Sequence, residues 1–156
     1  GLESIAHLTV TNKLKNATIS IPSPFESTNY IDLYMEKSKT KNKVELTNGT
    51  PYIKSNISIK ARIISMSDDY KYLDQETVDI IEQYASEYIK SYISDYLYKT
   101  AKEFKSDIAS FGKYAVSKFI TWQEWEKYNW LDNYQNSFFD VNVSVSVKSR
   151  YLIIDT

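Results

Sequence analysis

Three short segments in the first half of the chain alternate between apolar and polar side chains. Apolar side chains occupy the odd positions of residues 17–21, 31–35 and 57–63. This period of two is typical of a β-strand that turns one face to a core and the other to water. Asn48-Gly49, which adopts positive φ at low cost, and the Pro22-Ser23-Pro24 segment separate these runs. The pattern predicts antiparallel strands.

Two weaker segments extend this prediction. A further strand is expected at residues 5–10, where the alternation is poor. Residues 44–46 are expected to extend or follow the second strand.

The period changes to four after residue 74, which indicates a helix. Asp74-Gln75-Glu76 places acidic residues where a helix N-terminus favours them. Apolar side chains then recur at Ile81, Ala85, Ile89, Ile93, Leu97 and Ala101, beside a row of tyrosines at Tyr84, Tyr88, Tyr92 and Tyr96. The spacing predicts one amphipathic helix of about 25 to 30 residues.

The second half predicts shorter helices and a last strand. Ser106-Asp107 is expected to cap a helix that runs to Phe119 and buries Ile108, Phe111, Ala115 and Phe119, with Gly112 either closely packed or at a bend. Residues 121–136 carry all three tryptophans and predict one or two short helices. Alternating apolar side chains at residues 139–147 predict a long strand buried on one face.

The order of these elements predicts an α+β fold. Strands come first, helices follow, and the last strand returns to the sheet, whereas a parallel sheet would require alternating strands and helices. We therefore expect an antiparallel (mixed) sheet packed against a long amphipathic helix plus shorter helices. Residues 1–156 are expected to form a single domain that is a fragment of a longer chain.

Composition excludes most enzyme chemistry. The 156 residues contain no cysteine, one histidine (His7) and three scattered glycines, so thiolate chemistry, most metal sites and phosphate-binding glycine loops are not expected. An acid–base hydrolase built only from carboxylates is the one plausible enzyme, and we predict no enzyme, no cofactor and no metal. Nineteen basic and twenty acidic residues give a net charge of −1, which argues against nucleic acid and anionic membrane surfaces as partners.

Each candidate carboxylate has a simpler structural interpretation. Asp68, Asp69 and Asp74 lack the spacing of a calcium loop and suit a helix start. Asp107 is better explained as a cap than as a catalytic acid. Glu124 and Glu126 lie two residues apart, on different faces of a helix.

Aromatic and lysine side chains give the candidate contact surfaces. Tyr84, Tyr88, Tyr92 and Trp122 are candidate interface residues, although core packing is the stronger interpretation of the tyrosine row. We expect Trp125 and Trp130 to lie in the core. The lysines at positions 37, 39, 41 and 43 either contact phosphate headgroups or guard a solvated strand edge against aggregation.

An ordered set of residues in the second half resembles a known family. The set comprises Lys105 to Gly112 with Asp107 and Phe111, then Trp125, Asn129, Trp130, the Phe138-Phe139 pair and the alternating valines of residues 141–147. It is similar to the C-terminal domain of spore germination C subunits, the Ger(x)C or GerAC family. Ala109-Ser110 departs from the usual Phe-Gly of that pattern.

The resemblance implies a role that the residues alone do not. It implies a lipoprotein on the outer face of the spore inner membrane, which works beside the A and B subunits of a nutrient receptor and whose lipid anchor lies outside these residues. In that setting the domain is expected to act through protein contacts in receptor assembly. A small-ligand module that binds a nutrient or an ion remains the alternative.

Overall fold

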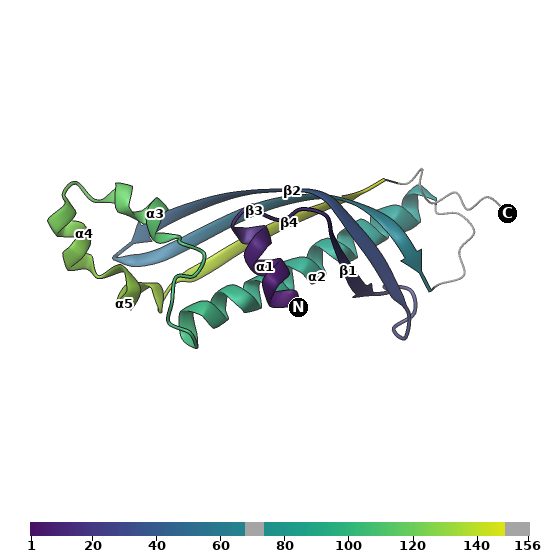
Figure 1. Cartoon of the computed structure of the whole chain (residues 1–156), viewed down its shortest axis with the longest axis horizontal. Coiled ribbons are helices and arrows are strands. Elements are labelled where there is room, and N and C mark those ends of the chain that lie inside the picture. The colour runs from purple at the N-terminus through teal and green to yellow at the C-terminus, as the bar shows by residue number, and fades with distance from the viewer. Residues whose placement is uncertain (68–73, 149–156) are drawn as a thin grey trace.

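The computed structural model describes residues 1–67 and 74–148, which contain one four-stranded sheet of order β1-β2-β3-β4 (Figure 1). Its strands are β1 (Ala17–Pro22), β2 (Tyr30–Thr47), β3 (Thr50–Met66) and β4 (Phe138–Val147). The first three are antiparallel neighbours, and β4 lies parallel to β3. The α+β class and the mixed sheet are therefore confirmed.

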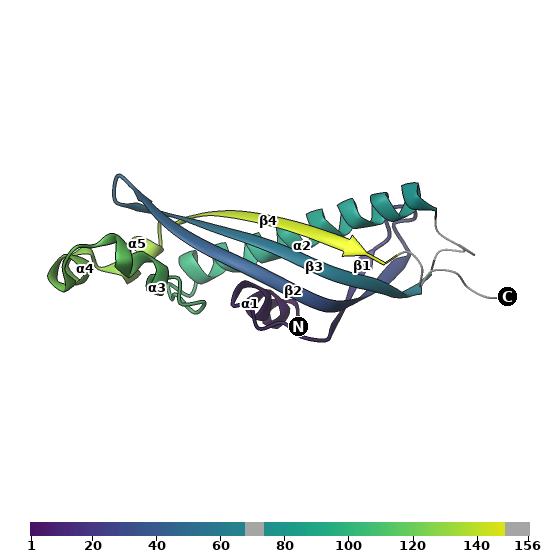
Figure 2. The same cartoon turned by 90° about the horizontal axis from the view of Figure 1, so that it is seen from above.

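The helices form a layer on one face of the sheet and a group at one end. The helices are α1 (Leu2–Val10), α2 (Gln75–Lys102), α3 (Gly112–Ala115), the 3-10 turn η1 (Val116–Lys118), α4 (Trp122–Tyr128) and α5 (Trp130–Tyr134). Figures 1 and 2 show α1 and α2 on the same side of the sheet, while α3, α4 and α5 gather at the end where β4 begins. In the described part of the chain, no helix covers the opposite face.

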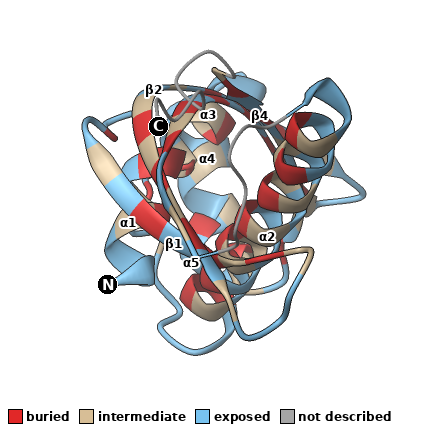
Figure 3. Ribbon diagram, turned by 90° about the vertical axis from the view of Figure 1, so that its right-hand side faces the viewer, coloured by how far each residue is buried: buried red, intermediate tan, exposed pale blue. Residues whose placement is uncertain are grey.

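The core lies between α2 and the inward face of the sheet. The alternate β3 side chains from Pro51 to Ile63 are buried, and those between them are mostly exposed. On α2 the stripe Ile81, Ala85, Ile89, Ile93, Leu97 and Ala101 is fully buried. Figure 3 shows these buried surfaces facing each other. The predicted long helix, which is 28 residues in the structure, is confirmed.

A β-bulge in β2 reverses which positions face the core. Odd positions point inward as far as Met35, but the register shifts between Met35 and Lys37, and Thr40 and Val44 are the buried positions beyond it. An extra residue in one strand produces such a reversal. Because of it, the lysines at 37, 39, 41 and 43 all lie on the exposed face.

The predicted strand at residues 5–10 is wrong, because this segment belongs to α1. Ala6, Thr9 and Val10 are buried at helical spacing, and α1 docks on α2 through polar contacts. Glu3 forms a 2.6 Å ion pair with Lys99, and Nδ1 of His7 lies 3.0 Å from the Tyr96 hydroxyl. His7 is therefore a helix-docking residue rather than a strand or loop histidine.

The helix predicted from Ser106-Asp107 to Phe119 is also largely wrong. Its only α-helical part is α3, which begins at Gly112 and is followed by η1. Ser110 has φ of 61°, which no helix residue adopts, and Ile108 is exposed. Phe111 and Ala115 are buried as expected.

Side chains from the helices cap the edge of β4 that faces away from β3. The β4 amides of Phe139, Val145 and Val147 donate to side chains of α2: the Tyr98 hydroxyl (3.2 Å), Ser86 Oγ (3.0 Å) and Glu82 Oε2 (3.0 Å) respectively. Amides that already donate to side chains are less available to another strand, so these three bonds help to protect the edge. The long helix thus supplies both a core stripe and an edge cover.

Candidate functional site

Residues 103–137, which we call the end lobe, are organised around the Asp107 carboxylate. Asp107 Oδ1 accepts from the Phe111 amide at 2.8 Å, and Oδ2 accepts from the Gly112 amide at 2.7 Å and from Trp130 Nε1 at 2.8 Å. One carboxylate therefore accepts hydrogen bonds both from amides at the start of α3 and from the indole of Trp130 in α5, which lies 23 residues from Asp107 in the sequence. Bonds of this kind to a carboxylate are stronger than neutral ones.

Gly112 lets Trp130 approach this carboxylate. A Cβ atom at position 112 would lie 2.9 Å from Trp130 Nε1 and 3.3 Å from Asp107 Oδ2. The predicted close packing at this glycine is thus a contact between the α3 backbone and an indole edge.

We expect Gly112→Ala to lower the free energy of unfolding by about 1 to 2 kcal/mol, because the added methyl displaces the indole. Thermal unfolding followed by tryptophan fluorescence measures this. Gly49→Ala is a useful comparison, since Gly49 has open space around it but a φ of 80°, so its cost comes from the backbone alone. An unchanged midpoint for Gly112→Ala would contradict the close packing.

Aromatic side chains continue from this centre into the sheet. The rings of Trp125 and Trp130 stack at 6.0 Å, and Trp130 contacts Tyr134, which packs edge-on against Phe139 of β4. The Tyr134 hydroxyl lies 2.7 Å from Thr100 Oγ1 of α2, and burial raises the pKa of this tyrosine. The end lobe is therefore fixed to both α2 and β4.

An exposed apolar tip stands on this fixed lobe. Ile120 is 93% exposed and Trp122 is 62% exposed, and the two flank Thr121, the N-cap of α4. Thr121 Oγ1 accepts from the Glu124 amide at 3.1 Å, and Glu124 Oε2 accepts from the Ile120 amide at 3.2 Å. Local bonds thus hold the backbone of the apolar tip, Ile120 and Trp122, in a defined conformation.

The tyrosine row lies on α2 rather than beside Trp122. Tyr84, Tyr88 and Tyr92 are half-buried against the core, and Tyr96 is buried. Tyr88 and Tyr92 contact each other edge-on at 5.9 Å, and burial raises the pKa of Tyr92. The candidate interface residues therefore belong to two separate surfaces, of which only the apolar tip is freely exposed.

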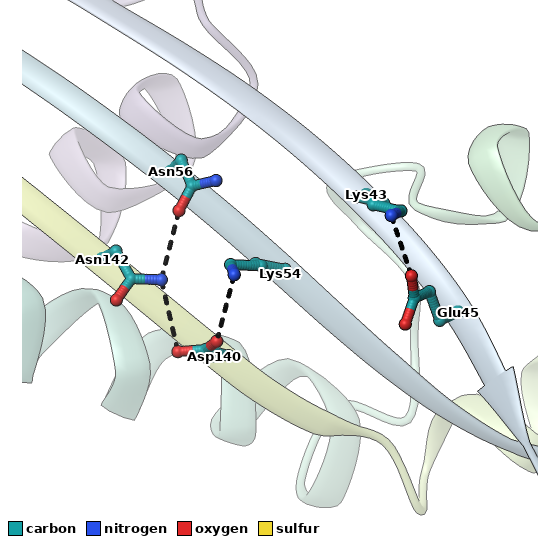
Figure 4. A network of polar contacts seen from close by, with 6 residues as sticks. All are labelled: Lys43, Glu45, Lys54, Asn56, Asp140 and Asn142. Atoms are coloured by element: carbon teal, nitrogen blue, oxygen red, sulfur yellow. Dashed lines mark hydrogen bonds and ion pairs between the residues drawn. The ribbon is translucent and has the colours of Figure 1, made fainter.

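A hollow of about 440 Å³ lies at the β2–β3 hairpin end of the sheet, lined by outward-facing side chains such as Tyr52 and Phe138 and also by Tyr98 of α2 and Phe139. Tyr52 and Phe138 stack there with ring centroids 5.1 Å apart. The charged groups around them already pair: Lys43 with Glu45 at 2.8 Å, and Lys54 with Asp140 at 4.0 Å (Figure 4). Asn142 extends this network by donating to Asn56 and Asp140.

The remaining candidate carboxylates have structural roles. Asp74 is the N-cap of α2 and accepts from the Thr77 amide at 2.8 Å. Hydrogen bonding from the Thr77 side chain, and then from its amide, lowers the pKa of Asp74. Glu126 accepts from Trp122 Nε1. Asp68 and Asp69 lie outside the described residues. Within residues 1–67 and 74–148, no three acidic or histidine side chains come together as a cation site.

The same described ranges contain no helix with both the length and the apolar character needed to cross a membrane.

One comparison with known proteins identifies a family, and another identifies a shared fold. Residues 1–150 match the family "Spore germination B3/GerAC like, C-terminal". The crystal structure of the GerBC protein superposes with a TM-score of 0.79 at 16% identity, over 93% of this chain and 44% of that chain. This chain thus spans less than half the length of that solved protein. No curated protein sequence matches it.

Proposed function

Because the chain belongs to the spore germination B3/GerAC-like C-terminal family, we propose that it is the C-terminal domain of a germinant receptor lipoprotein subunit. In this proposal the domain is not an enzyme, and it supports receptor assembly and germination by contacting the A and B subunits. The protein is anchored by a lipid outside these residues at the outer face of the spore inner membrane. The observation that carries the assembly role is the apolar tip.

The apolar tip has the properties of an interaction hot spot. An isoleucine as exposed as Ile120 contributes nothing to the core of this chain, yet burying such a side chain in a partner contributes about 1.5 to 3 kcal/mol. Tryptophan is enriched among residues that dominate binding energy. The bonds around Thr121 hold both residues in advance, which reduces the entropy lost on binding.

The end lobe supports a binding role more than a catalytic one. Asp107, Glu124 and Glu126 each accept hydrogen bonds that hold the backbone or an indole in place. A general acid or base must reach a proton of the substrate, whereas these carboxylates are engaged in fixing the lobe. The tryptophan and isoleucine that they position are suited to contact a partner.

We expect Ile120→Ser together with Trp122→Ala to weaken capture of the A and B subunits at least about tenfold, since two anchors are lost. Capture of the detergent-solubilised subunits by tagged chain measures this. The unfolding midpoint should change by less than about 2 °C, because neither side chain supports the core.

The matched control is Leu131→Ala, which removes another exposed apolar side chain of the end lobe, from α5. It should leave capture unchanged. Equal capture by the tip variant and the wild type would show that the apolar tip is not the contact.

The hollow at the hairpin end favours a second candidate, a small-ligand module. The stacked Tyr52–Phe138 pair offers an apolar floor between charged residues. A nutrient or ion bound at ten times its dissociation constant would raise the unfolding midpoint by about 3 to 6 °C. A rise in the unfolding midpoint of the wild type that Tyr52→Ser abolishes would support this candidate. If no amino acid, sugar, nucleoside or salt changes the midpoint, the candidate is rejected.

A further inference from the structure

The outward face of the sheet carries a group of lysines that the net charge of the chain conceals. Lys37, Lys39 and Lys41 of β2 and Lys60 of β3 lie together on this face, and we call these four the lysine face. All four are exposed, and none forms an ion pair with a residue in the described ranges. Four positive charges therefore lie uncompensated on one surface.

The strand register explains why these lysines have no carboxylate directly opposite them. Lys37 lies directly opposite Lys60, a placement of like charges that disfavours the sheet. Lys39 is opposite Ser58, and Lys41 is opposite Asn56. On β4 the same rows continue with Asn142, Ser144 and Ser146, so the centre of the face contains ammonium, hydroxyl and amide groups only.

The described carboxylates of this surface that form ion pairs lie towards its ends, where other cations pair with them. Glu36 lies 2.8 Å from Lys148 and 3.6 Å from Arg62. The hydrogen bond from Lys148, together with the charges of Lys148 and Arg62, lowers the pKa of Glu36. At the hairpin end, Glu45 pairs with Lys43 and Asp140 with Lys54 (Figure 4). These carboxylates therefore pair with cations other than the four lysines of the lysine face.

The balancing negative charge lies on the other side of the molecule. Exposed carboxylates of α2 include Glu76, Asp79, Glu87 and Asp95, and α2 covers the inward face of the sheet (Figure 2). Helix α2 also carries the exposed Lys90 and Lys102, but its acidic side chains outnumber its basic ones. A chain of net charge −1 therefore has its positive charge concentrated on the sheet face and an excess of negative charge on the helix side. The net charge argues against anionic surfaces as partners, but this argument does not apply to the lysine face alone. Salt screens electrostatic interactions beyond about 8 Å, so the distant carboxylates of α2 do not cancel the positive charge of this face.

We propose that the lysine face rests on an anionic lipid surface. The three β2 lysines extend over about 13 Å, since alternate strand residues are about 6.7 Å apart, and they contact an extended surface rather than a pocket. Lysine is a hydrated point charge that suits headgroups without fixed geometry. On the same side of the sheet, Arg62 is engaged by Glu36 and by the Tyr34 ring, and the exposed aromatic pair Tyr52–Phe138 lies at the hairpin end rather than among the four lysines. The lysines themselves have no planar fork to read bases, which disfavours nucleic acid.

The choice of lipid over an acidic protein as the occupant rests on the proposed function, in which a lipid anchor holds the protein at a membrane. Contact through the sheet face leaves the apolar tip available to protein partners, and the proposal does not depend on the tip. The two surfaces are separate, so each is tested by its own variant.

The test is flotation of the 156-residue chain with vesicles of phosphatidylcholine alone or mixed equally with phosphatidylglycerol. We expect binding to the anionic vesicles only, at least tenfold weaker in 500 mM than in 50 mM salt. Replacing the four lysines of the lysine face by glutamine should weaken binding at least about tenfold, since each lysine contributes about fivefold.

A matched variant controls for total charge. Lys90, Lys102, Lys113 and Lys127 are exposed lysines outside this face, and their replacement by glutamine changes the net charge equally. This variant should bind within about twofold of wild type, and both variants should retain the wild-type circular dichroism spectrum and unfolding midpoint. Equal losses in the two variants, or no binding of wild type to anionic vesicles, would overturn the proposal. Loss of subunit capture in the lysine-face variant, with vesicle binding absent in wild type, would point to an acidic protein surface instead.

Discussion

Asp107→Ala is expected to lower the free energy of unfolding by about 3 kcal/mol. The substitution leaves the amides of Phe111 and Gly112 and the indole of Trp130 without their acceptor. Hydrogen bonds to charged groups contribute about 1.5 to 3 kcal/mol each, and three such bonds on one group are not additive. The unfolding midpoint should fall by about 6 to 12 °C.

The experiment can separate loss of the lobe from loss of the whole fold. Trp130 is 7% exposed, so its fluorescence should shift to longer wavelength as the end lobe loosens, while the far-ultraviolet circular dichroism of α2 persists. Asp107→Asn keeps an acceptor oxygen and should lose roughly half as much stability. A wild-type midpoint for Asp107→Ala would show that this carboxylate does not hold the lobe.

Ile81→Ala is expected to cost about 3 kcal/mol through the cavity left under α2. Ile81 is fully buried in the core stripe, whereas the adjacent Ile80 is 41% exposed. Ile80→Ala makes the same chemical change on the other side of the helix and should shift stability by less than about 0.5 kcal/mol, since alanine favours the helix.

Denaturant unfolding of the two variants measures the difference directly. The unfolding free energy of each variant falls linearly with denaturant concentration. Equal slopes of this line, with different midpoint concentrations, would locate the effect in the native state. If both variants lost similar stability, α2 would not be docked through the face that carries Ile81.

Periodicity predicted the elements whose burial is regular. The stripe of α2 and the alternation of β3 and β4 follow from one face packing on a core, which a sequence displays directly. The strand predicted at residues 5–10 is wrong because Ile5, Thr9 and Val10 favour strands locally, while burial of Ala6 and Val10 in the folded chain selects a helix.

Contacts between distant residues were beyond the reach of local patterns. Asp107 follows Ser106 as a capping residue does, yet its longest-range partner is Trp130 of α5, and this pairing appears only in the folded chain. The alternating lysines are evident in the sequence. The face of the sheet that they occupy, however, depends on the bulge beyond Met35 and on the pairing of Lys37 with Lys60. Registers and bulges depend on strand partners and so are not readable from one segment.

The parallel pairing of β3 with β4 has a consequence for synthesis of the chain. Paired residues such as Asn56 and Asn142 are 86 positions apart. At about 5 to 20 residues per second, translation leaves the β3 edge without its strand for about 4 to 17 s. During that interval an open edge beside apolar β3 side chains is exposed to other chains. When β4 has been synthesised, it pairs with the β3 edge, and side chains of α2 bind outer amides of β4. The β3 edge is then no longer open to other chains.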